Sequence, residues 1–435
     1  MSRPFDREIA RLAFPALVTL LSEPLYLLVD TGVVGHLGAE ALGAVALASA
    51  LLLTVVTLCI FLVYGTTASV ARLIGAGDRR GAADDGVQGL WLAAWVGILL
   101  AVVLAAGSHP LVEILGGSGR TGAMAVSYLR ISTPGVPFLL VGFGGSGYLR
   151  GIQRTTPPML VAVAGAIVNI LADLILIPGL GYGVGASAFG TVVAQVITGI
   201  ALAVLVVRAA QSEGAPLRPR WLAQRRMIRV GADLAVRTAA LRLSLLLLTA
   251  VAARIGTDEL AAHQIAFEIW NFLALALDSL AIAGQAMVGL RLGRGDGEEA
   301  RAVANRLLRL GLIAGGAVAV VVLAASPVLP RVFTPDAEVV GLVRFLLLWV
   351  ALLQPLASLA WVLDGVLIGA GDQRFLAVAM VFAAVVFAVS AAPIVPLGLG
   401  IGWLWAAYAT LLLARVVVLG IRYRGDRWMR LGSVV

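Results

Sequence analysis

The chain has 435 residues, of which 60% are hydrophobic and only 13% are charged. Soluble globular domains have roughly 45–50% apolar and about 25% charged residues, so this composition excludes an ordinary soluble domain. The net charge is +8, and all 32 basic residues are arginines. In so apolar a chain, arginines set membrane topology and do not indicate a nucleic-acid partner. One cysteine, Cys59, leaves no internal disulfide and no cysteine-based metal site.

Apolar segments recur along the whole chain, each long enough to cross a hydrocarbon core of about 30 Å as a helix. The first residues mix acids with arginines and lack a small-residue cleavage site, so we do not interpret them as a signal peptide. We predict an all-α polytopic membrane protein with twelve transmembrane helices. The predicted spans are about 9–35, 42–71, 86–107, 124–149, 157–178, 186–208, 227–253, 260–290, 302–325, 338–368, 374–395 and 400–421.

The loops between these spans alternate in charge. One set is rich in arginine, whereas the other set contains only Arg120, Arg254 and Arg331. Because arginine-rich loops stay on the cytoplasmic side, we expect both termini to be cytoplasmic. We expect a multi-pass protein of the cell (inner) membrane, with the lipid bilayer as its surroundings and a monomer as its state.

The two halves of the sequence resemble each other. Two pairs of segments at one common offset show this: 36–47 with 254–265, and 72–82 with 290–300. We interpret this as a duplicated unit of six helices. Because six is even, the second copy enters the membrane from the same side as the first, and a pseudo-two-fold axis along the membrane normal relates the two copies. This layout is typical of secondary transporters.

The longest hydrophilic connection separates the two copies. It has the sequence QSEGAPLRPRWLAQRR and is rich in arginine. We therefore predict an N-terminal six-helix lobe at 1–210, a cytoplasmic linker at 211–226 and a C-terminal six-helix lobe at 227–435.

The first predicted helix carries polar residues within an apolar run. Glu23, Tyr26 and Asp30 are spaced three and four apart, so they share one stripe of the helix. A charge within a span costs about 2.5–3.5 kcal/mol on insertion scales, which favours a position facing the bundle interior or a wet cavity. Pro15 removes a backbone donor and predicts a bend in the same helix. The alternative is that the acids lie among lipid headgroups and Pro15 lies in the first helical turn.

A second polar pair lies on the fifth predicted helix. Asn169 and Asp173 are one turn apart and share a face. An amide oxygen and a carboxylate suit a hard cation such as sodium, and the carboxylate alone suffices for a proton. In the alternative interpretation, Asp173 only forms a hydrogen bond to a neighbouring helix.

Four motifs give the sequence a family resemblance over essentially its whole length. They are PALVTLLSEPLYLLVDTGVVGHLG at 15–38, NILADLILIPGLGYGVGASA at 169–188, AAHQIAFEIW at 261–270 and LDGVLIGAGD at 363–372. The sequence resembles the multidrug and toxic compound extrusion (MATE) family, and within it the DinF-like branch. The first two stretches are the more specific to that branch.

The resemblance implies a cation-coupling site within the first lobe. In the family this site combines an acid on helix one, an Asn and an Asp on helix five and a Thr on helix six. The corresponding residues, which would bind a proton or sodium, are Asp30, Asn169, Asp173 and Thr191. The resemblance also makes Pro15 the hinge of the first helix.

The resemblance implies a substrate cavity as well, with Tyr26 and Tyr128 among its lining residues. Glu23 stands where relatives can have a neutral polar residue, so it adds a negative charge for cationic substrates. Asp364 would line the cleft from the opposite side, as an acid on the tenth helix does in related transporters. The alternative for Asp364 is a structural pairing with Arg344 or Arg242.

The resemblance implies a secondary antiporter that exports amphipathic, often cationic, organic compounds in exchange for protons or sodium by alternating access. We expect no cofactor, no catalytic residues and no enzyme activity. A phosphate-binding motif of the form GxxxxGK[ST] is missing from the sequence, which argues against ATP-driven transport within this chain. One alternative is a flippase for a lipid-linked precursor, which would need a strongly cationic central cavity. Another is a membrane enzyme acting on lipids, which would need a cluster of His or acidic residues at a membrane face.

Overall fold

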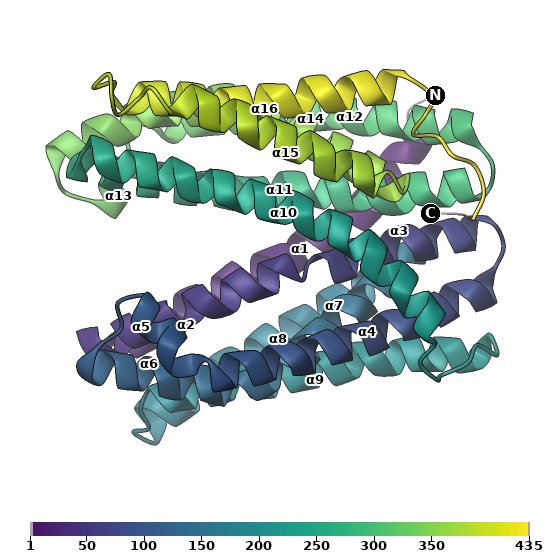
Figure 1. Ribbon diagram of the computed structural model, residues 1–435, viewed down its shortest axis with the longest axis horizontal. Coiled ribbons are helices and arrows are strands. Elements are labelled where there is room, and N and C mark those ends of the chain that lie inside the picture. The colour runs from purple at the N-terminus through teal and green to yellow at the C-terminus, as the bar shows by residue number, and fades with distance from the viewer. Residues whose placement is uncertain (1–2, 434–435) are drawn as a thin grey trace. The chain divides into compact units, whose positions relative to one another are not determined.

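The computed structural model describes residues 3–433 of the chain, and this part contains helices and no strand (Figure 1). The α-helices are α1 (Arg3–Gly35), α2 (Ala39–Leu58), α3 (Phe61–Gly75), α4 (Arg79–Ala106), α5 (Ser108–Ile114), α6 (Gly119–Ser132), α7 (Val136–Gly151), α8 (Thr156–Leu174), α9 (Val184–Ser212), α10 (Trp221–Ile255), α11 (Thr257–Gly293), α12 (Gly297–Ala325), α13 (Leu329–Phe333), α14 (Ala337–Gly369), α15 (Gln373–Ala391) and α16 (Ile401–Arg424). A short 3₁₀ turn, η1 (Thr133–Gly135), and a π-helical turn, η2 (Ile175–Gly179), complete them.

Twelve segments of the described chain are long and apolar enough to cross a membrane. They match the twelve predicted spans in order, which confirms the prediction of an all-α polytopic membrane protein. Two of the predicted spans are interrupted, however. The second consists of α2 and α3, and the fourth consists of α6, η1 and α7.

Local chemistry accounts for both interruptions. Before the first, Thr54 and Thr57 each donate a side-chain hydrogen bond to the backbone carbonyl four residues earlier. Such bonds compete with the helical ladder and bend helices. The backbone then changes to bonds spanning three residues, from the Cys59 N–H to the Val56 carbonyl at 3.0 Å. At the second interruption Pro134 lacks the N–H that a continuous helix requires.

The helices form two compact units, which we describe separately. The N-terminal unit comprises residues 14–231, and the C-terminal unit comprises residues 232–433 together with residues 3–13. This division differs from the expected lobes at 1–210 and 227–435, because the start of α1 belongs with the second half. Two ion pairs hold it there. Glu8 pairs with Arg291 at 2.6 Å, and Asp6 pairs with Arg306 at 2.6 Å.

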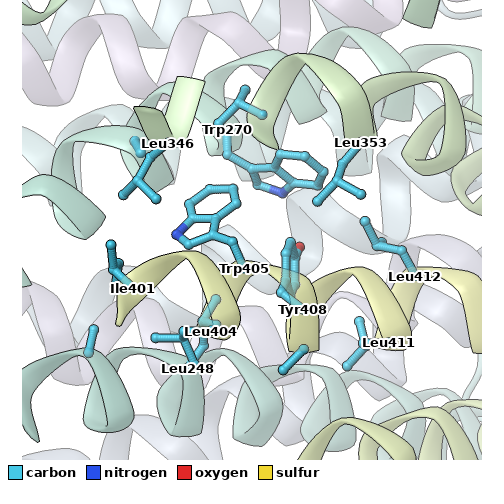
Figure 2. Packing of buried hydrophobic residues seen from close by; sticks show 14 of the residues in the cluster. Leu248, Trp270, Leu346, Leu353, Ile401, Leu404, Trp405, Tyr408, Leu411 and Leu412 are labelled. Atoms are coloured by element: carbon cyan, nitrogen blue, oxygen red, sulfur yellow. The ribbon is translucent and has the colours of Figure 1, made fainter. Parts of the chain in front are cut away.

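The C-terminal unit has an aromatic core between α11, α14 and α16. Trp270, Trp405 and Tyr408 pack edge to face, with ring centroids 5.4 to 6.4 Å apart (Figure 2). Leucines of α14, α16 and α10 surround these rings, as Leu248 of α10 does beside α16. All three rings are buried, and aromatic pairs in this edge-to-face geometry stabilise a core beyond the area that they bury.

The N-terminal unit packs its helices through small residues. Helix α7 lies against α3, α4 and α9 and carries the glycine-rich sequence GFGGSG. A Cβ atom at Gly147 would lie 2.8 Å from the Val63 carbonyl oxygen, and one at Gly144 would lie 3.0 Å from the Gly89 carbonyl oxygen. Only glycine permits such close approach of two backbones, a common device in membrane bundles.

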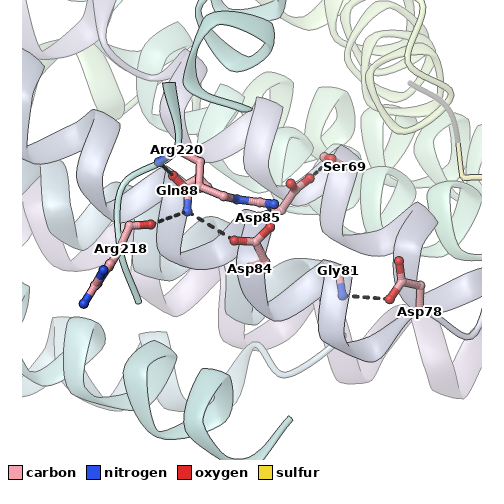
Figure 3. A network of polar contacts seen from close by, with 8 residues as sticks. All are labelled: Ser69, Asp78, Gly81, Asp84, Asp85, Gln88, Arg218 and Arg220. Atoms are coloured by element: carbon pink, nitrogen blue, oxygen red, sulfur yellow. Dashed lines mark hydrogen bonds and ion pairs between the residues drawn. The ribbon is translucent and has the colours of Figure 1, made fainter. Parts of the chain in front are cut away.

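The connection between α9 and α10 is fastened to α4. The Gln88 side chain donates to the Arg218 carbonyl at 3.0 Å and accepts from the Arg220 N–H at 2.8 Å (Figure 3). The Trp91 indole donates to the Leu217 carbonyl at 2.9 Å, and Arg220 forms an ion pair with Asp84. The predicted linker is therefore an ordered strap on the N-terminal unit.

Candidate functional site

The buried acid of α1 faces a hydroxyl group of α9. Asp30 is 4% exposed, and its Oδ1 accepts a hydrogen bond of 2.6 Å from Ser187. Glu23, two turns earlier on α1, has an exposed side chain, and Tyr26 between them is half-buried. The stripe predicted on the first helix therefore runs from an accessible acid to an enclosed one.

The polar pair of α8 lies in the interior of the same unit. Asn169 and Asp173 are both buried, and Asn169 donates from Nδ2 to the Thr191 hydroxyl at 3.0 Å. Both carboxylate oxygens of Asp173, and the amide oxygen of Asn169, are buried without a hydrogen-bond donor among the described residues. A buried polar atom without a partner is costly, so these three oxygens mark a place where a ligand can bind.

A glycine makes room for this acid. A Cβ atom at Gly190 of α9 would lie 3.2 Å from Asp173 Oδ1 and 2.9 Å from the Cβ of Ala172. Any larger residue at position 190 would crowd the carboxylate. Asp173 also lies just before η2, and irregular helical turns of this kind occur often at functional sites.

The described structure brings the four sequence-predicted coupling residues into one network. Asp30 and Asp173 lie close enough for their carboxylates to interact directly. The Tyr128 side chain of α6 interacts with the hydroxyls of Ser187 and Thr191, which links the Asp30 end of the network to the Asn169 end. Tyr128, expected only in the substrate cavity, is thus part of the site itself.

Ser187 is the member of this site that the sequence analysis missed. It lies four residues before Thr191, so it faces the same side of α9. That spacing is the only signal in the sequence that points to it. Its hydroxyl connects Asp30 with Tyr128.

The donor set suits a hard cation or a proton. It consists of carboxylate, amide and hydroxyl oxygens, which are ligands of sodium rather than of a transition metal. No group of three or more His, Cys, Asp or Glu side chains in the described chain could hold a metal ion. With two carboxylates, the site can change its charge by one on binding either a proton or sodium.

The acid of the tenth span has a different environment. Asp364 on α14 is buried between Arg237, whose Nη2 lies 2.5 Å from Oδ2, and Arg415. The Arg415 guanidinium also lies over the Trp361 ring, 5.3 Å from its centroid. The ion pairs that Asp364 forms in the structure are with Arg237 and Arg415, whereas Arg344 or Arg242 were the partners considered from the sequence. Instead, Arg344 donates to the Pro327 carbonyl at 2.7 Å.

Comparisons with known proteins agree with this architecture. The profile of the family described as MatE matches the chain twice, at residues 15–175 and 234–394. The chain is 32% identical over 427 residues to Protein DETOXIFICATION 44, chloroplastic, of Arabidopsis thaliana, covering 94% of this chain and 80% of that protein. It is 29% identical over 424 residues to DNA damage-inducible protein F of Escherichia coli (strain K12), covering 96% and 92%.

A solved structure described as the outward-facing conformation of a multidrug resistance MATE family transporter of the MOP superfamily superposes with a TM-score of 0.88. It covers 96% of this chain and 94% of that chain at 23% identity, which shows a shared fold. One family match in each half also fits the duplication seen in the sequence. The chain therefore belongs to the MatE family, as its resemblance to multidrug and toxic compound extrusion proteins implied.

Proposed function

We propose that this protein is a secondary antiporter that exports amphipathic, often cationic, organic compounds in exchange for protons or sodium. The observation that carries the proposal is the buried pair of Asp30 and Asp173, neither of which takes part in an ion pair found within residues 3–433. Two neighbouring carboxylates in a low-dielectric interior cannot both stay ionised without a compensating charge. A bound proton or a bound cation supplies that charge.

The proton and sodium alternatives use the same residues in different ways. A proton would be shared between Asp30 and Asp173, which gives the Asp173 oxygens the donor that the protein does not provide. Sodium would add the free oxygen of Asn169 and the hydroxyl of Thr191 as ligands. Both ions neutralise the pair, so both support the same exchange.

Coupling requires that ion and substrate prefer different conformations of the protein. We propose Pro15 as the point where α1 bends when the Asp30–Asp173 pair changes charge. Pro15 lies inside α1 and lacks the backbone N–H that would bond to the preceding turn. Glu23 and Tyr26, on the exposed part of the same stripe, would contact the cationic substrate.

The name of one relative supports organic compounds of several kinds as the substrates. One match, at 29% identity over 383 residues, is Multidrug resistance protein MdtK of Yersinia pseudotuberculosis. Together with the twelve spans, this supports a membrane transporter rather than an enzyme. We further propose that both termini lie in the cytoplasm, since the arginine-rich loops share their side of the membrane.

The test is efflux of a fluorescent organic cation from proteoliposomes under an imposed pH gradient or an imposed sodium gradient. We expect flux driven by one of the two gradients in the wild type and at least a tenfold loss in Asp173→Asn. Glu113→Gln, which changes an exposed acid of the same unit, is the matched control and should transport normally.

Two outcomes would count against the proposal. Normal gradient-driven flux in Asp173→Asn would remove the acid pair from the coupling step. No gradient-driven flux of any organic cation in the wild type would favour a lipid-linked substrate, the alternative that the sequence left open.

A further inference from the structure

We propose that the hollow between α13 and α14 binds the phosphate headgroup of an anionic phospholipid. This hollow has a volume of about 400 Å³ and is lined by Arg331, Pro335, Ala337, Val340, Gly341 and Arg344. Two guanidinium groups therefore face one small space within the C-terminal unit. Arginine is the side chain best suited to bind phosphate through paired hydrogen bonds.

Neither arginine is neutralised by the protein. In the described part of the chain, no carboxylate lies within 4.0 Å of Arg331 or Arg344. The nearby Asp336 is engaged elsewhere, because its Oδ1 accepts from the backbone N–H groups of Glu338 and Val339 at 2.8 and 3.2 Å. Two like charges that line one hollow repel each other, and a bound anion relieves that repulsion.

Arg344 is held in position but not satisfied. Its Nη2 donates to the Pro327 carbonyl at 2.7 Å, which fixes the side chain across the hollow. Its Nε is buried and has no acceptor within the described structure. The Arg331 side chain is exposed at the rim. One arginine is therefore pre-positioned with a free donor, and the other is free to close on a ligand.

An apolar stripe on α14 begins at the hollow. This stripe favours a lipid over a soluble anion as the ligand, because only a lipid has acyl chains that can lie along it. Gly341, Phe345, Leu348 and Leu352 are exposed and are spaced four, three and four apart along α14, so they form one face. From Gly341 to Leu352 the helix rises by about 16 Å. This is roughly half of a hydrocarbon core of about 30 Å, the depth that the acyl chains of one leaflet fill.

The positive-inside rule does not account for two arginines on this side of the membrane. The loop between α12 and α14 belongs to the arginine-poor set, which we place outside the cytoplasm. Of the other two arginines in that set, Arg120 is ion-paired with Glu40. Recognition of a headgroup gives Arg331 and Arg344 a role on this side of the membrane.

The experiment measures lipid binding to the purified full-length protein in detergent, by native mass spectrometry during titration with phosphatidylglycerol or phosphatidylcholine. We expect phosphatidylglycerol to bind the wild type at least tenfold more tightly than phosphatidylcholine. The double variant Arg331→Gln/Arg344→Gln should lose that preference. Arg254→Gln, which changes an exposed arginine of the same loop set, is the matched control and should keep it.

A single variant and a competition with inorganic phosphate complete the experiment. The single variant Arg331→Gln removes an exposed side chain and should weaken phosphatidylglycerol binding at least threefold without changing the melting temperature. Inorganic phosphate at millimolar concentration should not displace the lipid. Displacement by phosphate would overturn the lipid assignment in favour of a soluble anion, and equal lipid binding by wild type and both variants would overturn the site. The readout does not depend on transport, so it is independent of the proposed antiport.

Discussion

The two units differ in the groups that surround their buried acids. In the N-terminal unit, Asp30 and Asp173 lie together with hydroxyl and amide groups, and no ion pair found among the described residues involves either acid. In the C-terminal unit, Asp364 lies between Arg237 and Arg415. Burial of an acid within a span therefore does not by itself distinguish the two sites. We propose that the lack of an ion-pair partner marks the coupling site, because a buried acid without one requires an ion from solution.

The duplicated sequence makes this comparison sharper. Asp30 aligns with Leu248 at the offset of 218 residues between the halves, and Asp173 aligns with Ser390 after a slippage of one residue. Leu248 is fully buried in the apolar core, and Ser390 accepts a hydrogen bond of 3.2 Å from Thr410 on α16. The C-terminal unit thus keeps a polar contact between its last two spanning helices, as Asn169 and Thr191 do, but without the acids.

The largest effect that we predict is on the stability of the folded protein. Asp364→Asn removes the carboxylate that pairs with Arg237 and Arg415, and removing one partner of a buried ion pair costs about 3–5 kcal/mol. We expect a marked fall in melting temperature, measured by the unfolding of the purified protein in detergent. Asp173→Asn should differ from the wild type by less than about 1 kcal/mol, because no cation loses its partner. Similar melting temperatures for the two variants would contradict the contrast between the units.

A smaller effect should follow from the hydroxyl that the sequence analysis missed. Ser187→Ala removes the donor to Asp30 but leaves both acids in place. A typical hydrogen bond within a protein contributes about 0.5–1.5 kcal/mol net. We expect ion-driven efflux to fall about threefold to tenfold, less than in Asp173→Asn, in initial-rate measurements. Ser187→Thr keeps the hydroxyl and serves as the control; if Ser187→Ala transports at the wild-type rate, Ser187 has no part in the site.

The smallest effect that we predict concerns the segments outside the spans. The N-terminal unit holds its strap through Gln88, and the C-terminal unit holds the end of α16 through Asn305, which accepts from the Tyr423 hydroxyl at 2.8 Å. Gln88→Ala removes two bonds to the strap backbone, each contributing about 1 kcal/mol. We expect trypsin to cleave after Arg220 severalfold faster than in the wild type.

Two variants check this result. Gln211→Ala changes an exposed glutamine at the first position of the strap and should be cleaved at the wild-type rate. Asn305→Ala should loosen only the end of α16, so its cleavage after Arg220 should stay unchanged. Equal cleavage of Gln88→Ala and wild type would mean that Trp91 and Asp84 suffice to hold the strap.

The sequence predicts what depends on local pattern. The twelve spans follow from apolar runs, and the candidate acids follow from charges within those runs. The interruption of the second span at Cys59 was not predicted. It follows bonds from threonine side chains to the backbone of their own helix, and a sequence does not show whether a threonine forms such a bond. The partners of Asp364 were missed for another reason. Arg237 and Arg415 lie 127 and 51 residues away in the chain, and helix packing alone brings them together.

The division of the chain into units has a mechanical consequence. Both boundaries fall inside continuous helices, between Ala13 and Phe14 in α1 and between Gly231 and Ala232 in α10. The polypeptide therefore crosses from one unit to the other within helices rather than within loops. Pro15 and Gly231 lie beside these boundaries, and both residue types weaken the interior of a helix. We therefore expect α1 and α10 to bend more easily at these two positions than elsewhere along their length.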